Sequence, residues 1–507
     1  MLLTLRGFVS LSLLTVGAIR RRSLASLSFM NSSGKWPSWF VLTRHWLSLV
    51  GIALVTTAVI SWLFVLPQQI RGHVDNPYVG IVLFLVVPAV FFIGLVLIPI
   101  GVYLAKRRIR RGLAEGAFDR KVALSRLAWF FGVTTVLNVL IGTQFTYRAI
   151  NHMETPQFCG QSCHSMNPEF AAHLNSPHAK VECVECHVAP GAGGWIASKT
   201  SGIRQLLETV FETFPRPIPS AIETNRLVPA RETCENCHWS QKFGSVKLRI
   251  LTHYAEDEQN TRTQTVFMMM VGGSKFAGIH GKHFAPGISI RFAPADSKRQ
   301  TIPWVEYRNS TTGETETFLS EGSTPDAIKA LPVYEMQCVD CHNRPTHTFQ
   351  SAARGMDDAL VLGEIATGLP FIKKKGVELL TATYQSRAEA AEKLPSGLIS
   401  FYQQTYADLY AKRPQDIQQA AQAILAIYNR NVFPELKVTW GTYPNNLGHT
   451  EFPGCFRCHD GSHTTANAKT ITQDCNACHE PLAMDEASPE ILKTLGLEER
   501  ISKVQKK

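Results

Sequence analysis

Acidic residues are scarce in the first 146 residues, and no long apolar run follows Phe145. The first 146 residues hold 3 Asp and Glu against 15 Lys and Arg, whereas residues 147–507 hold 38 against 36. The formal net charge of +10 therefore arises from the N-terminal part. A domain that binds nucleic acid needs a basic surface, because neutralising phosphates supplies much of its affinity. The balanced charge after residue 146 argues against nucleic acid as a partner.

Three apolar runs lie before residue 147, from about Trp46 to Leu66, Gly80 to Leu104 and Leu127 to Phe145. Each is long enough to cross a hydrocarbon layer about 30 Å thick. A chain of 507 residues also exceeds what one hydrophobic core can organise. We predict a membrane α-helical anchor with three spans over residues 46–146, followed by at least two further subdomains.

Basic residues cluster before the first run and between the second and third, whereas the loop between the first two holds only Arg71 and Asp75 as charged residues. By the positive-inside rule, residues 1–45 and the second loop are cytoplasmic, and everything after the third span is exported. The expected location is a bacterial inner (cytoplasmic) membrane, with a multi-pass anchor and a domain facing the periplasm.

Residues 1–19 are also apolar and precede three arginines. They are a signal-like segment, an additional span, or sequence upstream of a true start at Met30. The prediction of three later spans holds under each of these alternatives.

The sequence has no unpaired cysteine. Its 12 cysteines form six pairs, and a histidine follows each pair directly. The pairs with their histidines are Cys159, Cys163 and His164; Cys183, Cys186 and His187; Cys234, Cys237 and His238; Cys338, Cys341 and His342; Cys455, Cys458 and His459; Cys475, Cys478 and His479. We refer to them as motifs one to six.

This spacing is typical of covalent haem attachment. Two thiols about one turn apart form thioethers to one haem, and the adjacent histidine lies beneath the iron as its axial ligand. Structural zinc and disulfides also use paired cysteines. Six pairs that all carry a histidine favour six covalent haem c groups over those alternatives. Motif one has three residues between its cysteines, and this longer spacer still lets both sulfurs reach one porphyrin.

A low-spin haem needs a second axial ligand, most often another histidine. Five histidines lie near the motifs and are expected to serve haems two to six: His178, His280, His347, His449 and His463. Three others form a reserve: His173, His253 and His283. Met166, two residues after the histidine of motif one, is expected to ligate haem one, and a thioether ligand raises a reduction potential.

Patterns between the motifs divide the exported part further. Residues 147–242 hold three closely spaced motifs and little apolar sequence, so haems are expected to fill their interior. Residues 243–334 carry strand and hairpin signals and predict a small β-rich insert. Residues 335–487 combine three more motifs with a helical arm of 3.6-residue periodicity. Residues 488–507 form a charged tail, expected to be peripheral. The haem-packed domain is therefore expected to be mostly α-helical and irregular.

The stretch from Phe158 to His238 resembles the NapC/NirT family of membrane-anchored quinol dehydrogenases. The resemblance rests on FCGQSCHSM, SPHAKVECVECH, the Lys-containing GWIASKTSGIRQLLETVFETF and ARETCENCH. Typical members have one span and four haems, whereas this chain is similar to longer relatives with three spans. Residues 147–242 are accordingly interpreted as a trihaem domain of NapC/NirT type.

The resemblance implies that menaquinol or ubiquinol docks beside haem one and that a lysine and an acid line its site. It also implies Met166 as a ligand and Lys199 as the matching lysine. The acid has no counterpart at the expected spacing, and Gln205 and Glu208 are the nearest polar residues. The expected partners are the inner membrane, the quinone pool and periplasmic c-type cytochromes, in anaerobic or metal respiration.

Two other functions fit the same residues. One is a terminal reductase in which a haem with an open position reduces a small substrate such as nitrite. The other is a passive electron-carrier anchor whose separate partner oxidises quinol. The sequence predicts neither the direction of electron flow nor the oligomeric state.

Overall fold

The computed structural model describes residues 45–69, 87–111, 120–162, 164–225, 227–239, 244, 246–272 and 278–497. The expected cytoplasmic segment, apart from His45, lies outside these residues, as do Met30 and residues 498–507 of the tail. The chain divides into two compact units, Met1–Asn151 and His152–Lys507.

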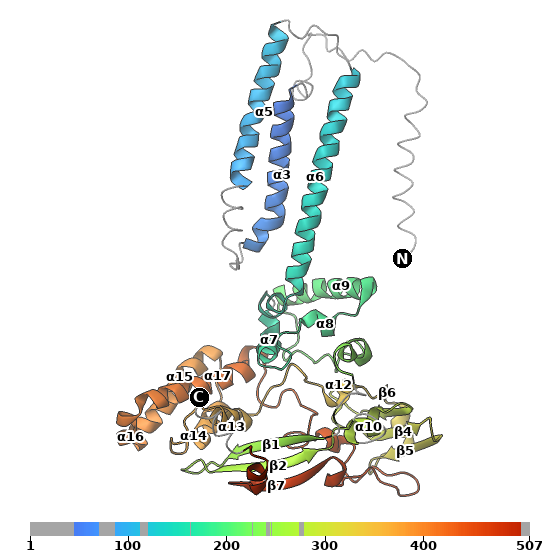
Figure 1. Ribbon diagram of the computed structural model, residues 1–507, viewed down its shortest axis with the longest axis vertical. Helices are drawn as coiled ribbons and strands as arrows, with labels where there is room; N and C mark the ends of the chain where they lie inside the picture. Colours follow the sequence, from blue (N-terminus) through green and yellow to red (C-terminus); the bar gives the residue numbers. More distant parts are fainter. Residues whose placement is uncertain are drawn as a thin grey trace. The chain divides into compact units, whose positions relative to one another are not determined.

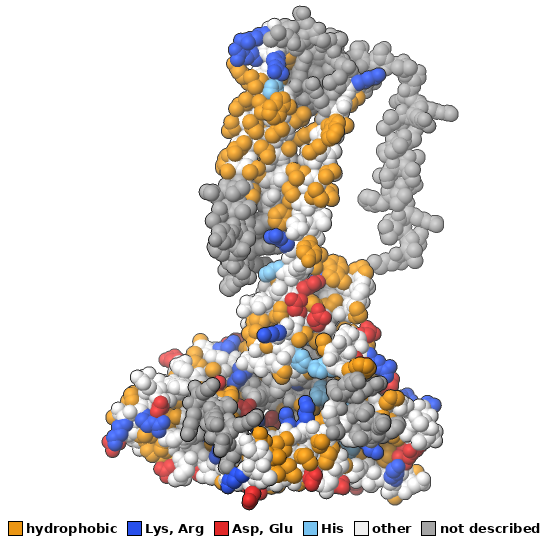
Figure 2. Space-filling view, viewed as in Figure 1, with side chains coloured by type: hydrophobic (Ala, Val, Ile, Leu, Met, Phe, Trp, Pro, Cys, Tyr) orange, Lys and Arg blue, Asp and Glu red, His pale blue; other side chains and the backbone are white. Residues whose placement is uncertain are grey.

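Three long helices coincide with the three apolar runs: α3 (Trp46–Gln69), α5 (Val87–Arg110) and α6 (Arg120–Glu154) (Figure 1). Two segments are long and apolar enough to cross a membrane, Val87–Arg110 and Leu127–Glu154, and the apolar part described in α3, Trp46–Ser61, is shorter. Hydrophobic side chains cover α5 and α6 on the face shown in Figure 2. These features indicate a membrane protein, and the third span stays a prediction.

Helices α3 and α5 approach closely through glycine. A Cβ atom on Gly51 would lie 2.7 Å from the carbonyl oxygen of Gly94, and one on Gly94 would lie 2.8 Å from that of Gly51. Small residues let helix backbones meet in this way where lipid supplies no hydrophobic drive for association. The two helices therefore pack as a pair within the first unit.

The second unit begins with short helices that carry the first three motifs. Their bounds are η2 (Phe158–Ser162), η3 (His164–Met166), α7 (Asn167–Leu174), α8 (Cys183–His187), α9 (Gly191–Val210), η4 (Ala230–Glu232) and η5 (Cys234–Asn236). No side chain of α8, α9 or η5 is buried. Side-chain packing therefore supplies little interior for this region.

The β-rich insert forms two small antiparallel sheets, as the strand signals predicted. The first has the order β1 (Lys247–Tyr254), β2 (Arg262–Met269), β7 (His479–Glu486). The second has the order β5 (Glu314–Leu319), β4 (Trp304–Asn309), β3 (Ile288–Ala293), β6 (Tyr334–Glu335). Helix α10 (Gly278–Phe284) lies between β2 and β3 in sequence, and α11 (Pro325–Lys329) precedes β6.

The first sheet is not confined to the predicted insert. Its third strand, β7, starts at the histidine of motif six and pairs with β2, with His479 opposite Met269 and Ala483 opposite Val266. The sequence alone assigned this strand to the C-terminal region. The sheet thus joins the insert to the last motif.

The remaining elements form the predicted helical arm and carry the last three motifs. They are α12 (Cys338–Cys341), α13 (Ala352–Val361), α14 (Ile372–Thr381), α15 (Arg387–Thr405), α16 (Ala407–Lys412), α17 (Pro414–Asn431), η7 (Pro434–Leu436), η8 (Gly454–Arg457), η9 (Cys475–Ala477) and α18 (Glu490–Thr494). Helices α13 to α17 bury a continuous core that includes Met356, Leu394 and Ile424, each 0 % exposed. Asp357 attaches this arm to β1 by accepting a hydrogen bond from Tyr254 N at 3.0 Å.

The predicted tail is partly packed. Leu492 of α18 is 1 % exposed and forms a small core with Val266 and Ala483. The described part of residues 488–507 is therefore not wholly peripheral, because an apolar residue of α18 covers the first sheet.

Candidate functional site

The six motifs lie on short helical turns. In motifs three, four and five the backbone N–H of the histidine donates to the carbonyl of the first cysteine, at 2.7, 2.8 and 3.0 Å. Such a turn brings both thiols to one side of the backbone and places the histidine directly after them, which is the arrangement that haem attachment needs.

The described residues contain neither a cluster of metal-binding side chains nor a disulfide. Among the described residues, no three or more His, Cys, Asp or Glu side chains gather as a metal site. The 11 described cysteines form no disulfide with one another. Burial raises the pKa of Cys341 to about 11 and that of Cys458 to about 12.

Five motif histidines each face a second histidine. The pairs and the distances between their ring centroids are His187 with His347, 6.2 Å; His238 with His178, 5.8 Å; His342 with His280, 6.2 Å; His459 with His283, 5.9 Å; and His479 with His449, 6.1 Å. Every motif histidine from motif two to motif six therefore has one partner histidine.

These distances match two imidazoles on opposite sides of one metal ion. A metal–nitrogen bond is about 2 Å long and a ring nitrogen lies about 1.1 Å from the ring centre, so the two centroids should be about 6.2 Å apart. The described residues thus fit a haem iron between each pair.

Hydrogen bonds from Nδ1 orient five rings of these pairs. The Nδ1–H groups of His178, His280, His283, His347 and His459 donate to the backbone carbonyls of Pro345, Val271, Ile279, Glu169 and Thr472, at 3.2, 3.0, 2.7, 3.0 and 2.7 Å. Metal-bound histidines usually donate their other ring N–H in this way. Nε2 is then the nitrogen available to a metal in each of these five rings.

His463 does not fit the ligand role that its place in the sequence suggested. It is 1 % exposed, its Nδ1 lies 2.8 Å from Asp460 Oδ1, and its Nε2 lies 2.7 Å from the carbonyl oxygen of Ile302. With both ring nitrogens engaged by protein oxygens, no lone pair faces an iron. His283, placed in the reserve, faces His459 instead.

The other two reserve histidines have structural contacts. His173 is 3 % exposed, and its Nε2–H donates to the carbonyl of Val181 at 2.9 Å. His253 lies on β1, where its Nδ1 is 3.1 Å from Asp357 Oδ2. Each holds segments of the fold together.

One short helix supplies the partners of two motifs. His280 and His283 both belong to α10 and face His342 of motif four and His459 of motif five. Gly278 begins the helix with a φ of +63°, and a Cβ atom there would lie 2.5 Å from the carbonyl oxygen of Met270. Only glycine fits this backbone without displacing the helix.

The early motifs lie next to one another in order of sequence. A hydrogen bond with Cys183 is the main cause that lowers the pKa of Cys159 to about 7, which links motifs one and two. Burial raises the pKa of Cys186, and the nearby Cys234 adds to the rise, which links motifs two and three.

The later motifs continue the same order. Burial raises the pKa of Cys338 with a contribution from Cys234, and it raises that of Cys341 with a contribution from Cys455. Burial likewise raises the pKa of Cys478, and Cys455 contributes again. Successive motifs from three to six are therefore neighbours, as the earlier ones are.

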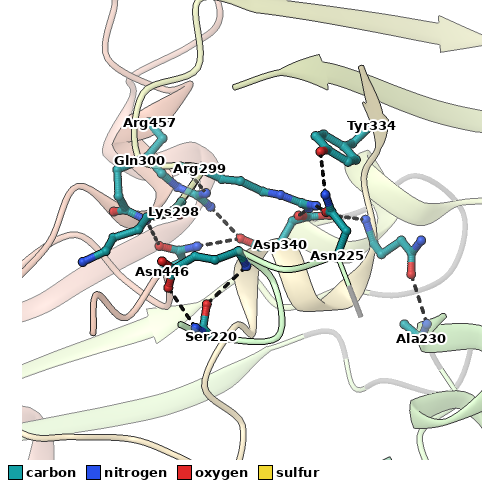
Figure 3. Close-up of polar contacts among 12 residues, drawn as sticks. Ser220, Asn225, Ala230, Lys298, Arg299, Gln300, Tyr334, Asp340, Asn446 and Arg457 are labelled. Atoms are coloured by element: carbon teal, nitrogen blue, oxygen red, sulfur yellow. Dashed lines mark hydrogen bonds and ion pairs between the residues drawn. The ribbon is translucent and has the colours of Figure 1, made fainter. Parts of the chain in front are cut away.

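A buried polar cluster fixes the third, fourth and fifth motif regions relative to one another (Figure 3). Arg299, from the loop between β3 and β4, donates to Asp340 Oδ1 of motif four at 2.6 Å and to Asn225 Oδ1 at 2.8 Å. Arg457 of motif five donates to the carbonyls of Arg299 and Asp340, at 2.8 and 2.6 Å. Burial raises the pKa of Asp340, and both arginines oppose that rise.

Motif one is described only in part. Cys163 and the side chain of His164 lie outside the described residues. Met166 is half-buried at the start of α7. Its expected role as a haem ligand stays a prediction.

Lys199 lies on α9 beside an acid that precedes motif one. Its Nζ is 3.5 Å from Oε1 of Glu154, the last residue of α6. Trp195, one turn earlier on α9, donates its Nε1–H to the same oxygen at 3.3 Å. Sequence reasoning sought an acid after motif two and missed Glu154. Its position at the end of an apolar helix, five residues before Cys159, was the available signal.

Gln205 and Glu208 are not brought to Lys199. Glu208 is nine residues along the helix, about 180° around its axis at about 100° per residue, and Gln205 is about 120° away. Glu208 pairs with Arg204 at 3.4 Å, and Gln205 donates to Ser201 Oγ at 3.3 Å. The expected grouping of all three around one ligand therefore does not fit a straight α9.

The side of α9 that carries Lys199 is otherwise apolar and exposed. The exposed apolar residues of α9 on this side are Trp195, Ile196, Ile203, Leu206, Leu207 and Val210, and exposed Phe211 follows directly after the helix. They recur at helical spacing on one stripe, which is typical of a helix that lies in a membrane interface.

Comparison with known proteins gives two matches. The family model described as "NapC/NirT cytochrome c family, N-terminal region" matches residues 122–263. The curated "Cytochrome c-type protein ImcH" of Geobacter sulfurreducens is 38 % identical over 445 residues, which cover 86 % of this chain and 87 % of that protein. No solved structure gives a significant match.

Proposed function

The chain belongs to the NapC/NirT cytochrome c family, and from that premise we propose that it oxidises quinol beside motif one and passes the electrons through six c-type haems to periplasmic acceptors. Membership makes it a membrane-bound multihaem cytochrome of electron transfer with covalent haem c. The number of haems, the quinol and the acceptors are the proposal. Menaquinol or ubiquinol is the donor, soluble c-type cytochromes are the acceptors, and anaerobic or metal respiration is the setting.

The five histidine pairs carry the relay part of the proposal. In each of motifs two to six, the two cysteines would hold the haem and the paired histidines would ligate its iron. We assign His347, His178, His280, His283 and His449 as the second ligands of haems two to six. Bound haem supplies reversible one-electron chemistry, and the protein sets its potential through ligands and burial.

The ligand set also explains how neighbouring haems are kept close. His178 lies five residues before motif two but faces motif three, and His449 lies six residues before motif five but faces motif six. In both cases the segment that attaches one haem also carries the proposed second ligand of the next haem along the chain. This supports a relay from motif one to motif six in the order of the sequence.

The alternatives receive less support. A terminal reductase needs an open position at a haem, whereas the histidine pairs of motifs two to six would fill both axial positions. A passive anchor needs no cluster of Lys199, Glu154 and Trp195 beside motif one. The apolar stripe of α9 around Lys199 supports entry of an isoprenoid quinol at the membrane surface of the proposed periplasmic side.

The test uses the purified full-length protein in lipid nanodiscs. A reduced menaquinone analogue should reduce the haems optically, and dithionite should reduce all six. A soluble c-type cytochrome added afterwards should reoxidise them. Reduction by dithionite but not by the quinol analogue would reject quinol oxidation and favour the passive anchor. Resonance signals of a high-spin haem among motifs two to six would favour the reductase.

A further inference from the structure

The acid beside Lys199 occupies a distinctive place in the fold. Glu154 is the last residue of α6, and the segment Leu127–Glu154 is apolar enough to span a membrane. Its carboxylate meets the apolar stripe of α9 through Lys199 and Trp195. A carboxylate at the end of a span and at the edge of an apolar helix lies where a lipid-soluble molecule would present its polar group.

The contacts of Glu154 orient its carboxylate through only one of its two oxygens. Lys199 Nζ and Trp195 Nε1 both donate to Oε1, at 3.5 and 3.3 Å. Neither contact involves Oε2, which is therefore available to accept a proton from a ligand. The side chains of Lys199 and Glu154 are 24 % and 27 % exposed, so the pair is sheltered but accessible.

Glu154 is also close to the first haem attachment. The largest effects on the pKa of the Cys159 thiol come from the hydrogen bond with Cys183 and from burial. The charge of Lys199 also lowers this pKa, and the charge of Glu154 raises it. A group bound at Glu154 is therefore near the electron acceptor expected at motif one. The acid of α9 itself, Glu208, pairs with Arg204 and lies on the opposite side of the helix from Lys199.

We propose that Glu154 is the proton acceptor for quinol oxidation, with Lys199 and Trp195 as its positioning residues. The inference rests on the proposed function and names a catalytic group for it. Quinol loses two electrons and two protons and becomes quinone. Each electron reduces the ferric c-type haem of motif one in turn. Each hydroxyl proton passes to Oε2 of Glu154, which releases it to water before accepting the next.

The experiment follows haem reduction by a reduced menaquinone analogue in stopped flow, with full-length protein in nanodiscs. Glu154→Gln should slow reduction about 100-fold, the usual contribution of a general base, while dithionite still reduces every haem. In the unsubstituted protein the rate should fall at low pH as the carboxylate is protonated. The substitution should remove that acidic limb and the solvent isotope effect.

Two further variants separate chemistry from structure. Glu154→Asp should recover part of the rate and retain an acidic limb, because a carboxylate remains. Glu212→Gln is the matched control, since Glu212 also pairs with a basic residue at 3.5 Å, Arg216, but is 70 % exposed and lies beyond the end of α9. It should react like the unsubstituted protein.

The inference is overturned if Glu154→Gln reacts at the unchanged rate with the acidic limb intact. It is equally overturned if Glu208→Gln, rather than Glu154→Gln, removes that limb. Failure of the proposed function looks different, because then the unsubstituted protein itself is not reduced by quinol.

Discussion

At the scale of single residues, His283 and His463 show how ring nitrogens decide between ligation and packing. His283 uses Nδ1 in a hydrogen bond within α10 and faces the ring of His459. His463 uses both nitrogens in hydrogen bonds to protein oxygens. The position of His463, four residues after the histidine of motif five, favoured it in the sequence. Only the fold brings residue 283 to that motif.

Separate substitutions of His283 and His463 by residues that do not bind iron test which of the two is a haem ligand. His283→Ala should convert one low-spin haem to high spin, because haem five loses its second ligand. His463→Gln, which keeps hydrogen-bonding groups in place, should leave the number of low-spin haems unchanged. Electron paramagnetic resonance of the oxidised protein counts both. A high-spin signal in His463→Gln together with none in His283→Ala would reverse the assignment.

Two arginines of the insert provide a matched stability test. Arg299 pairs with buried Asp340 and is 12 % exposed, whereas Arg291 pairs with Glu306 and is 50 % exposed. Removing one partner of a buried pair costs about 3–5 kcal/mol, and an exposed pair contributes about 0–1 kcal/mol. Arg299→Gln should therefore lower the melting temperature clearly more than Arg291→Gln. Equal shifts in thermal unfolding would contradict the role given to Arg299.

The residues that attach haem could be predicted from sequence, because covalent attachment requires local spacing. Second ligands and the acid Glu154 belong to contacts between segments far apart in the chain. Four of the five ring partners, His178, His280, His347 and His449, are among the candidates that the sequence offered, and their pairing with motifs is visible only in the fold. The sequence candidates for the quinol-site acid follow motif two, whereas the proposed acid, Glu154, precedes motif one.

At the scale of elements, α10 couples two haem sites through seven residues. A substitution at Gly278, the first residue of α10, should therefore affect both proposed haem sites together. Gly278→Ala places a Cβ atom 2.5 Å from a backbone carbonyl and demands a strained positive φ, so α10 must shift. We expect the low-spin signals of haems four and five to change together, with the remaining haems unaffected.

A second glycine serves as the control for that experiment. A Cβ atom on Gly244 would meet no atom within 4 Å. Gly244→Ala should leave all resonance signals as they are. A perturbation of only one haem by Gly278→Ala would show that His280 and His283 are not held by one rigid element.

The helical arm and the strands of the insert were expected from the sequence because their patterns are local. The pairing of β7 with β2 was not, since these strands are separated by more than 200 residues. Burial of Leu492 was missed for the same reason, because its partners Val266 and Ala483 lie on those strands.

At the scale of the whole molecule, the order of the motifs makes the two ends of the relay separable. Replacing Cys475 and Cys478 by Ala should remove haem six. Quinol should still reduce the other haems at the normal rate, while transfer to a soluble cytochrome c should become slow. Replacing Cys159 and Cys163 should have the opposite effect, with quinol reduction lost and transfer after dithionite reduction retained. Quinol reduction that depends on Cys475 and Cys478 would contradict a linear relay.

The uneven distribution of buried side chains bears on how the protein is made. The arm of α13 to α17 has a core of its own, whereas α8, α9 and η5 bury none of their side chains. The arm can therefore fold before haem is attached, whereas the region of motifs two and three is expected to fold only once its proposed haems are bound. In cells with defective haem attachment, proteases should cut first between residues 183 and 239 and leave the arm as a resistant fragment.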